Sequence, residues 1–356
     1  YMDGISLSRV VMQALSEKPE RQPEVAWLPS PRDDLAGRRR SILAQFGDAL
    51  RRAGRSVLIG PALAKILTKH GLRLLNLSGR ELPVPFTAPR TAFNTPLTQA
   101  RSIGVADLPL ARLRSIARHA GVTVNDVLLE LCDAGMTRYL EDMHVAPAKP
   151  LVAQMPISLR EVSGGRGNQI TIALLELGSD EPDPVRRLQR IHRHTNDVKR
   201  EFAGMPAEAA ELYTVLLQSI AQFGELTGLD RFAPPLGNVV ISNVIGAERP
   251  LYLDGAPLRA VYPVSTIAPG LAVNITAYTY NDNLHVGIVA GASAIPDPAS
   301  LIAHLKAALR DLERGMGIAP PPRKPGKQTK PAHAAAKSGG TRARSRQRAG
   351  DKGAQQ

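Results

Sequence analysis

Cysteine is almost absent from this 356-residue sequence, in which Cys132 is the only one. A single cysteine excludes a disulfide within the chain and a structural zinc site made of several thiolates, and it suits a reducing compartment. Aromatic residues make up only 4% of the chain, which leaves few side chains for stacking on nucleic-acid bases. No apolar run approaches the roughly 20 residues of a membrane-spanning helix. We therefore expect neither a disulfide-stabilised domain nor a transmembrane segment in this sequence.

Several common catalytic motifs are missing as well: G-x-S-x-G, G-x-x-x-x-G-K-[ST] and H-E-x-x-H. The glycine-rich run at 164–167 lacks the dinucleotide-binding spacing and precedes a predicted strand, so we interpret it as a turn. His192 and His194 stand two residues apart in a predicted helix and point to different sides, which argues against a shared metal ion. Cys132 lies within a predicted helix and is interpreted as a packed thiol. We expect no metal.

Acidic residues are scarce in two segments, although the whole chain carries a net charge of +13. Residues 320–356 contain ten lysines and arginines and one aspartate, and residues 35–75 contain nine lysines and arginines and one acid, Asp48. The rest of the chain is slightly acidic. Such basic segments favour anionic partners, which include phospholipid headgroups, the phosphates of CoA and nucleic acid.

Hydrophobic periodicity predicts an α+β fold with a large mixed sheet, because helices and strands follow one another in irregular order. Asp297 is expected to cap the last helix, with Pro298 at its first position. The predicted helices lie at 110–120, 123–139, 185–198, 212–220 and 298–315. The predicted strands lie at 151–160, 168–178, 237–244, 251–265 (around an Asp254-Gly255 turn), 271–280 and 284–290.

Composition divides the chain into four parts. Residues 78–100 contain four prolines and predict an extended crossover between residues 1–77, which include the basic amphipathic segment, and the regular region 101–316. Residues 317–356 lack large apolar side chains after Ile318 and are expected to be disordered.

Four short polar motifs carry the chemistry: Asp3-Gly4, Asn125-Asp126, Gly167-Asn168-Gln169 and Ser242-Asn243-Val244. With the blocks around them, they resemble the bacterial wax ester synthase/diacylglycerol acyltransferase (WS/DGAT) family from Tyr1 to about Gly315. The resemblance implies a CoA-dependent acyltransferase fold, like that of chloramphenicol acetyltransferase, with two subdomains and part of the N-terminal one missing. The blocks are AGVTVNDVLLELCDAGMTRYL, KPLVAQMPISLR, GNQITIALLELG, DPVRRLQRIHRHT, SNVIGAERPLYLDGAPLRAVYPVS and NITAYTYNDNLHVGIVA.

The family's active-site motif is H-H-x-x-x-D-G, and Tyr1-Met2-Asp3-Gly4 resembles its last four positions. The resemblance implies that the second histidine is the general base that deprotonates an acceptor alcohol, a task for which imidazole is suited because it titrates near neutral pH. We expect this histidine to precede Tyr1, and the sequence as printed to be inactive without it. Asp3 either caps the following helix or orients the motif through an ion pair, for which Arg160 is the candidate partner.

The remaining polar candidates each have a structural and a functional interpretation. Thr123 and Asp126 fit a capping box, which accounts for Asp126, whereas the resemblance places Asn125 near the catalytic tunnel. Turn chemistry accounts for Asn168, Ser242 and Asn243. The resemblance instead implies that they line the channel between the two halves, where amide donors polarise the thioester oxygen.

The resemblance implies an O-acyltransferase that moves a fatty acyl group from acyl-CoA to diacylglycerol or to a long-chain alcohol, without a cofactor. Its lipid substrates imply a cytoplasmic protein held peripherally at the inner membrane surface or at lipid droplets, with 35–75 as the contact segment. No specific nucleic-acid partner is expected. Two alternatives stay open: a condensation or transacylation enzyme of the same superfamily, and a noncatalytic protein that associates with membranes or polyanions.

Overall fold

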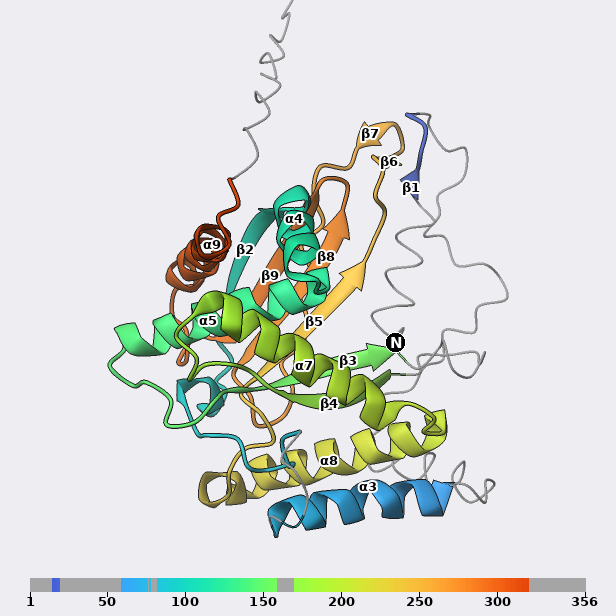
Figure 1. Cartoon of the computed structure of the whole chain (residues 1–356), viewed down its shortest axis with the longest axis vertical. Helices are drawn as coiled ribbons and strands as arrows, with labels where there is room; N and C mark the ends of the chain where they lie inside the picture. Colours follow the sequence, from blue (N-terminus) through green and yellow to red (C-terminus); the bar gives the residue numbers. More distant parts are fainter. Residues whose placement is uncertain (1–14, 20–58, 76, 78–81, 159–169, 320–356) are drawn as a thin grey trace, which may run out of the picture. The chain divides into compact units, whose positions relative to one another are not determined.

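A six-stranded mixed sheet forms the centre of the protein (Figure 1). The computed structural model describes residues 15–19, 59–75, 77, 82–158 and 170–319. In spatial order the strands are β2 (Arg101–Pro109), β9 (Asn283–Gly291), β8 (Val273–Tyr280), β5 (Val239–Ile245), β3 (Val152–Ser158) and β4 (Ile170–Glu176). A small second sheet joins β1 (Leu15–Ser16), β6 (Tyr252–Leu253) and β7 (Ala256–Pro257).

Strands β8, β5 and β3 are parallel to one another; β9 pairs antiparallel with β8, β4 with β3, and β2 with β9. All eight residues of β8 and all but the first of β9 are buried, as the nearly continuous apolar sequence of an interior strand requires. The two strands are joined by a tight turn at which Asn281 adopts a φ of 53°, a left-handed conformation that asparagine tolerates better than most residues. The sheet core is therefore defined by β8 and β9.

Helices α4 (Leu110–Ala120), α5 (Val124–Asp142), α7 (Pro184–Phe202) and α9 (Pro298–Gly315) cover one face of this sheet (Figure 1). Helix α5 lies between α7 and α9 and is buried over most of its length. Gly135 allows α9 to approach closely, because a Cβ at this position would collide with Leu305. The short helix η1 (Ala92–Asn94) precedes β2.

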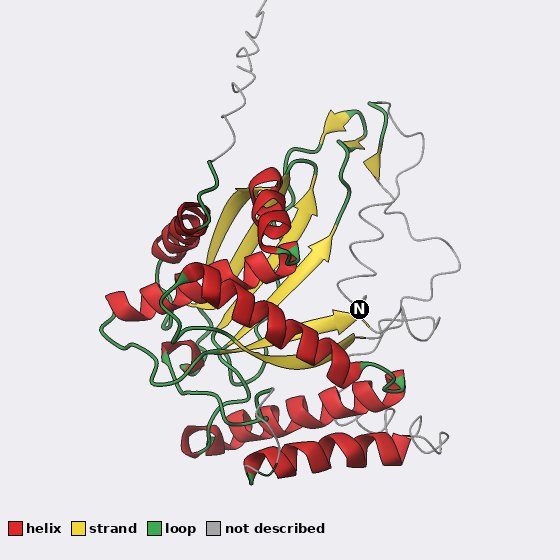
Figure 2. Ribbon diagram, in the orientation of Figure 1, coloured by secondary structure: helices red, strands yellow, loops and turns green. Residues whose placement is uncertain are grey.

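Two further helices, α3 (Ile59–Leu74) and α8 (Ala207–Thr227), lie side by side next to β4 (Figure 2). Helix α8 covers the edge of the sheet, where Thr214 Oγ1 accepts a hydrogen bond of 2.9 Å from the backbone N–H of Ile172. Helix α3 is attached by His70, whose Nε2 lies 2.8 Å from Tyr213 Oη, and by Arg73 through Glu201 on α7. The helix η2 (Leu229–Phe232) follows α8.

The helix ends predicted from capping residues are confirmed, whereas α7 and α8 extend beyond the predicted ranges 185–198 and 212–220. Helix α4 ends at Gly121, which has a φ of 68°, and Asp297 caps α9 through the N–H of Ala299. Thr123 and Asp126 form the predicted capping box at the start of α5. Helix α5 continues to Asp142, three residues past its predicted end.

Two strand predictions need correction. Residues 258–265 are not a strand: β6 and β7 have two residues each, and the following segment lies against the sheet. This placement depends on Gly287, where a Cβ would collide with the carbonyl oxygen of Pro263. Strand β2 was not predicted, because its buried positions are Gly104, Ala106 and Leu108 while its outward positions include apolar side chains. Its alternation of burial therefore does not match an alternation of polarity.

Several predictions lie outside the described residues: the helix after Asp3, the turn at 164–167 and most of the tail. Helix α3 is the described part of the basic segment 35–75. None of the helices in the described ranges combines the length and apolarity that a membrane crossing needs.

Candidate functional site

The sheet opens between β3 and β5, two of its three parallel strands. They pair only at Ala153–Val239 and Gln154–Val240, although both strands continue for at least four residues beyond this point. Figure 1 shows them diverging toward their carboxyl ends. In open sheets, ligands bind in the crevice beyond the carboxyl ends of parallel strands, where neighbouring strands separate. We call the region between 155–158 of β3 and 241–245 of β5 the wedge.

Helix α5 begins against one side of the wedge. The Nδ2 atom of Asn125, in the first turn of α5, lies 3.7 Å from Sδ of Met155, the first β3 residue past the paired positions. Sulfur is a weak acceptor, so this contact leaves most of the hydrogen-bonding capacity of the amide available. The structure thus places Asn125 at the wedge.

Asp126 has a different role, because its carboxylate is buried and connects α5 to α7. It accepts hydrogen bonds from Thr123 N (2.9 Å) at the start of α5, and from Thr195 Oγ1 (2.7 Å) and His192 Nδ1 (2.8 Å) on α7. Burial opposes ionisation, but the hydrogen bonds from His192, Thr123 and Thr195 outweigh it and hold the pKa of Asp126 below its ordinary value. Asn196 Nδ2 lies 3.0 Å from the other nitrogen of His192. The structural interpretation, in which Asp126 caps α5 and connects it to α7, therefore accounts for this residue.

Ser242 and Asn243 are not in a turn, as the turn interpretation had it, but inside β5. Strand β5 keeps its parallel pairing with β8 as far as Ile245–Thr279, one residue past its predicted end. Their side chains point to opposite faces of the sheet because strand side chains alternate. Asn243 shares the face of Met155, since both stand an even number of residues from the paired positions Val239 and Ala153.

The Asn243 side chain offers an unused acceptor. Its Oδ1 atom is enclosed and has no hydrogen-bond partner among the described residues. A buried polar atom without a partner is costly, at about 1–3 kcal/mol, and the few that occur in native proteins call for an explanation such as a missing water or ligand. Asn125 and Asn243 therefore bring two amides to the same face of the wedge, one from the helix and one from the strand.

A third amide, which the sequence analysis missed, lies on the opposite face. Gln154 is completely buried at the last paired position of β3, and its Oε1 accepts a hydrogen bond of 2.9 Å from Nε2 of Gln218 on α8. Gln154 Nε2 and Gln218 Oε1 remain without partners. The available signal was a glutamine inside the otherwise apolar strand LVAQMPI.

A buried ionic network behind the wedge was also missed. Arg187 of α7 lies 2.8 Å from Glu130 of α5, and Asp133 accepts hydrogen bonds from Gly178 N and Ser179 Oγ. Burial raises the pKa of Glu130 to about 7 and that of Asp133 to about 6, even though Arg187 opposes both shifts. These carboxyls hold α5 to α7 and to the end of β4. Burial likewise raises the pKa of Cys132, which is fully enclosed.

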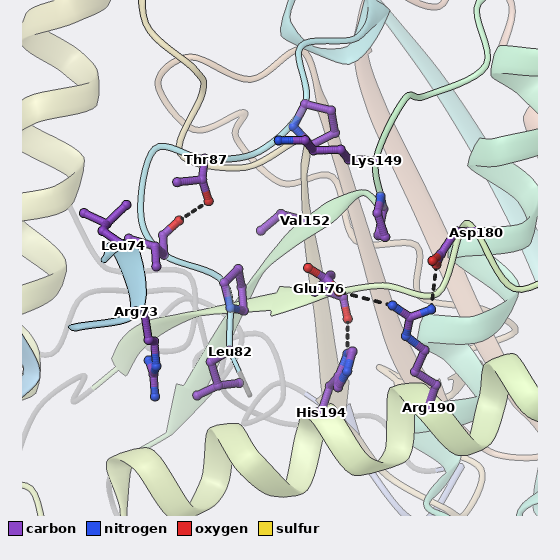
Figure 3. Close-up of a pocket in the computed structure, with 14 residues that line it drawn as sticks. Arg73, Leu74, Leu82, Thr87, Lys149, Val152, Glu176, Asp180, Arg190 and His194 are labelled. Carbon is purple, nitrogen blue, oxygen red and sulfur yellow. Dashed lines mark hydrogen bonds and ion pairs between the residues drawn. The ribbon is translucent and has the colours of Figure 1, made fainter. Parts of the chain in front are cut away.

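A cavity of about 430 Å³ lies at the other end of β3, near Val152 (Figure 3). Arg190 on its wall contacts Asp180 at 2.7 Å and Glu176 at 3.4 Å. His194 Nδ1 lies 2.7 Å from the carbonyl oxygen of Glu176. His194 and His192 thus have separate partners, as predicted. Because its charges are largely paired within the protein, we do not assign the catalytic chemistry to this cavity.

Four predicted site residues lie outside the described residues: Asp3, Gly4, Arg160 and Asn168. Within the described ranges, no group of three or more histidine, cysteine or acidic side chains is placed to hold a metal ion.

Comparisons with known proteins identify the family of this chain. The family model of the wax ester synthase/diacylglycerol acyltransferase catalytic domain matches residues 1–128, and that of the WS/DGAT C-terminal domain matches residues 166–313. The wax ester synthase/diacylglycerol acyltransferase of Marinobacter aquaeolei VT8 superposes with a TM-score of 0.65 at 29% identity, over 89% of this chain and 66% of that enzyme. The α+β fold predicted from the resemblance is confirmed.

Mycobacterial relatives indicate the same family. A Mycobacterium tuberculosis protein that bears the name of a diacylglycerol O-acyltransferase is 33% identical over 319 residues, which are 89% of this chain and 69% of that protein. A second one, Tgs4, is 37% identical over 258 residues, which are 70% of this chain and 53% of that protein. The chain thus spans about two thirds of the length of its relatives or less. The chain belongs to the wax ester synthase/diacylglycerol acyltransferase family, whose members are acyl-CoA-dependent O-acyltransferases.

Proposed function

We propose that this protein transfers a fatty acyl group from acyl-CoA to the hydroxyl group of diacylglycerol or of a long-chain alcohol. The observation that carries the proposal is the wedge, which opens between β3 and β5 in a chain of this family and receives amides from two elements. The products are a triacylglycerol or a wax ester together with free CoA.

In the reaction, the acceptor oxygen forms a bond to the thioester carbonyl carbon, and the bond from this carbon to sulfur breaks. A base removes the hydroxyl proton during the attack, and the proton ends on the departing CoA thiol. The carbonyl oxygen becomes negatively charged in between, and a preorganised N–H donor stabilises that charge. We assign this donation to the Nδ2 N–H groups of Asn125 and Asn243, with Asn168 as a further candidate, whereas Ser242 on the other face lines the channel.

The base itself is the second histidine of the H-H-x-x-x-D-G motif that ends at Asp3-Gly4. Asp3 orients this motif, with Arg160 as its partner. These assignments rest on the resemblance of the motif. Reading the codons ahead of Tyr1 tests them directly, and an absence of paired histidines there contradicts them.

Both proposed substrates are lipids, so the protein has to meet them at a lipid–water boundary. We propose that it works peripherally on the cytoplasmic side of the membrane or at lipid droplets. Its basic segment 35–75, of which α3 is the described part, supports this location because it combines cations with apolar side chains.

The test is an acyl-transfer assay on the protein with whatever residues its gene encodes ahead of Tyr1. Labelled acyl-CoA is offered with diacylglycerol or hexadecanol, and labelled triacylglycerol or wax ester is the expected product. Asn243→Ala should lower kcat about tenfold to a hundredfold, because a lost oxyanion donor costs up to about a thousandfold. Gln189→Ala, which removes an amide on α7 that donates to the carbonyl oxygen of Ala120, is the matched control and should keep its kcat.

Two results contradict the proposal. One is product formation from an acyl-carrier protein thioester but not from acyl-CoA, which identifies a condensation or transacylation enzyme. The other is full activity of both Asn125→Ala and Asn243→Ala, which removes the wedge amides from the mechanism.

A further inference from the structure

Large apolar side chains are exposed together at the end of α8 and on η2. Within thirteen residues, five of them have between 47% and 83% of their surface open to solvent. The three on α8 follow one another at three-residue spacing and lie along one side of the helix. The five are Ile220, Phe223, Leu226, Leu229 and Phe232.

The apolar side of helix α8 is buried in the first half of the helix. There, Leu212, Tyr213 and Leu217 are buried against α3, α7 and the sheet. The apolar side of a helix is normally covered along its whole length. The exposed second half of α8 therefore has the character of a surface that meets another apolar phase.

Helix α3 extends this surface. Ala62 and Leu63 pack near the start of α8, on Ala209 and Leu212, and His70 contacts Tyr213, so the two helices run in the same direction. Their carboxyl ends consequently lie together (Figure 1). The end of α3 and the residues after it expose further leucines, namely Leu67, Leu72, Leu74, Leu75 and Leu77. We call these leucines and the five side chains of α8 and η2 the apolar face.

The charges around the apolar face have both signs, but the exposed ones include cations. Helix α3 contains Lys65, Lys69 and Arg73 and no acidic residue, although Lys69 and Arg73 pair with Glu201. Glu225 of α8 and Asp230 of η2 are partly buried. Lys65 is exposed on α3, and Arg231 is exposed on η2. A surface of this kind, with leucine and phenylalanine beside lysine and arginine, matches the boundary between headgroups and acyl chains in an anionic bilayer.

The apolar face also contains a pocket of about 250 Å³, between the end of α8 and residues 233–236. Its mouth is shaped by Arg90, whose guanidinium donates hydrogen bonds to the carbonyl oxygens of Asp230 and Ala233. Phe86, Ile220 and Phe223 are among the side chains that line it. The pocket gives a single alkyl chain a place to enter the protein from a lipid surface.

We propose that the apolar face docks the protein on phospholipid membranes with anionic headgroups, with Phe223 and Phe232 inserted into the bilayer. This inference rests on the proposed function in one respect: an enzyme for lipid substrates needs such a surface. It adds the site of contact, which the sequence analysis confined to 35–75 and which the structure extends to α8 and η2.

Co-sedimentation of the whole chain with vesicles tests the docking. Phosphatidylcholine vesicles with and without phosphatidylglycerol are compared at low and high salt, because salt screens attraction through the basic segments but not apolar insertion. Phe223→Ser/Phe232→Ser should lower the partition coefficient at least about tenfold at high salt, since two large apolar side chains no longer insert. Lys65→Gln/Arg231→Gln should weaken binding only to phosphatidylglycerol vesicles at low salt.

The matched control is Met143→Ser/Val145→Ser, which removes two exposed apolar side chains after α5 and should leave binding unchanged. Melting curves verify that each variant is folded. Wild-type affinity of the phenylalanine variant at high salt overturns the proposal. So does a wild-type chain that self-associates through these phenylalanines, as light scattering would reveal, without binding vesicles. No acyl-CoA is present, so the result is independent of whether the protein catalyses acyl transfer.

Discussion

Replacing Asp126 with alanine removes the connection between the start of α5 and the middle of α7. The carboxylate is 1% exposed and accepts hydrogen bonds from Thr123, His192 and Thr195. Alanine offers none of these acceptors. The change therefore tests whether the aspartate of the Asn125-Asp126 pair is a structural residue.

The expected cost follows from the groups that lose their partner. Loss of the helix cap at Thr123 costs about 1 kcal/mol. The His192 N–H and the Thr195 hydroxyl lose a charged acceptor, at up to about 3 kcal/mol each when buried. Thr195 also bonds to a backbone carbonyl, and the His192 side chain is 25% exposed, so both keep part of their hydrogen bonding. We expect the free energy of unfolding to fall by about 3 kcal/mol.

Urea denaturation followed by circular dichroism measures this loss, and Asp183→Ala is the matched control. Asp183 caps α7 through the N–H groups of Val185 and Arg186 and is exposed, so its loss should cost only about 1 kcal/mol. An Asp126→Ala variant no less stable than Asp183→Ala would refute the bridging role. Acyl transfer measured well below the unfolding transition should fall only through the altered position of Asn125, because the aspartate itself is not expected to touch substrate.

Three further predictions concern stability. Gly287→Ala should lower the melting temperature by several degrees, because the new Cβ collides with the carbonyl of Pro263 and displaces the segment over the sheet. Burial raises the pKa of Glu130 from 4.5 to about 7, so between these pH values the folded state holds a proton that the unfolded state has lost. The free energy of unfolding should therefore fall as the pH rises from 4.5 to about 7. Glu130→Gln should flatten this pH dependence in urea titrations. Gln154→Leu alone should destabilise more than Gln154→Leu/Gln218→Leu, because the single change leaves the second amide buried without a partner.

Local sequence signals predicted the helix ends well. Gly121, the capping box at Thr123 and the Asp297-Pro298 pair each act within one helical turn, so their effect is readable without knowledge of the fold. Strand β2 was missed because its core-facing residues are small and its outward Ile103 is 55% exposed. Pairing with β9 along its whole length compensates for this weak pattern, and such pairing is not readable from the strand alone.

The site was predictable only in part for a similar reason. The pattern around Asn125 and Asn243 identified both residues, but their common face depends on where β3 and β5 stop pairing. The partners of Gln154 and Glu130 lie 64 and 57 residues away in the sequence. No local spacing indicates such contacts, so both polar groups were hidden within apolar segments.

The two residues of the Asn125-Asp126 pair divide their tasks because they occupy adjacent positions in the first turn of α5. Successive helix positions are 100° apart, so one side chain can face α7 while the next faces β3. The buried carboxylate fixes the rotation of the helix against His192 and Thr195, and this rotation determines where the amide of Asn125 points. Exchanging the two residues would preserve composition and charge but turn the amide away from the wedge. We therefore expect the order of the pair to matter as much as its chemistry.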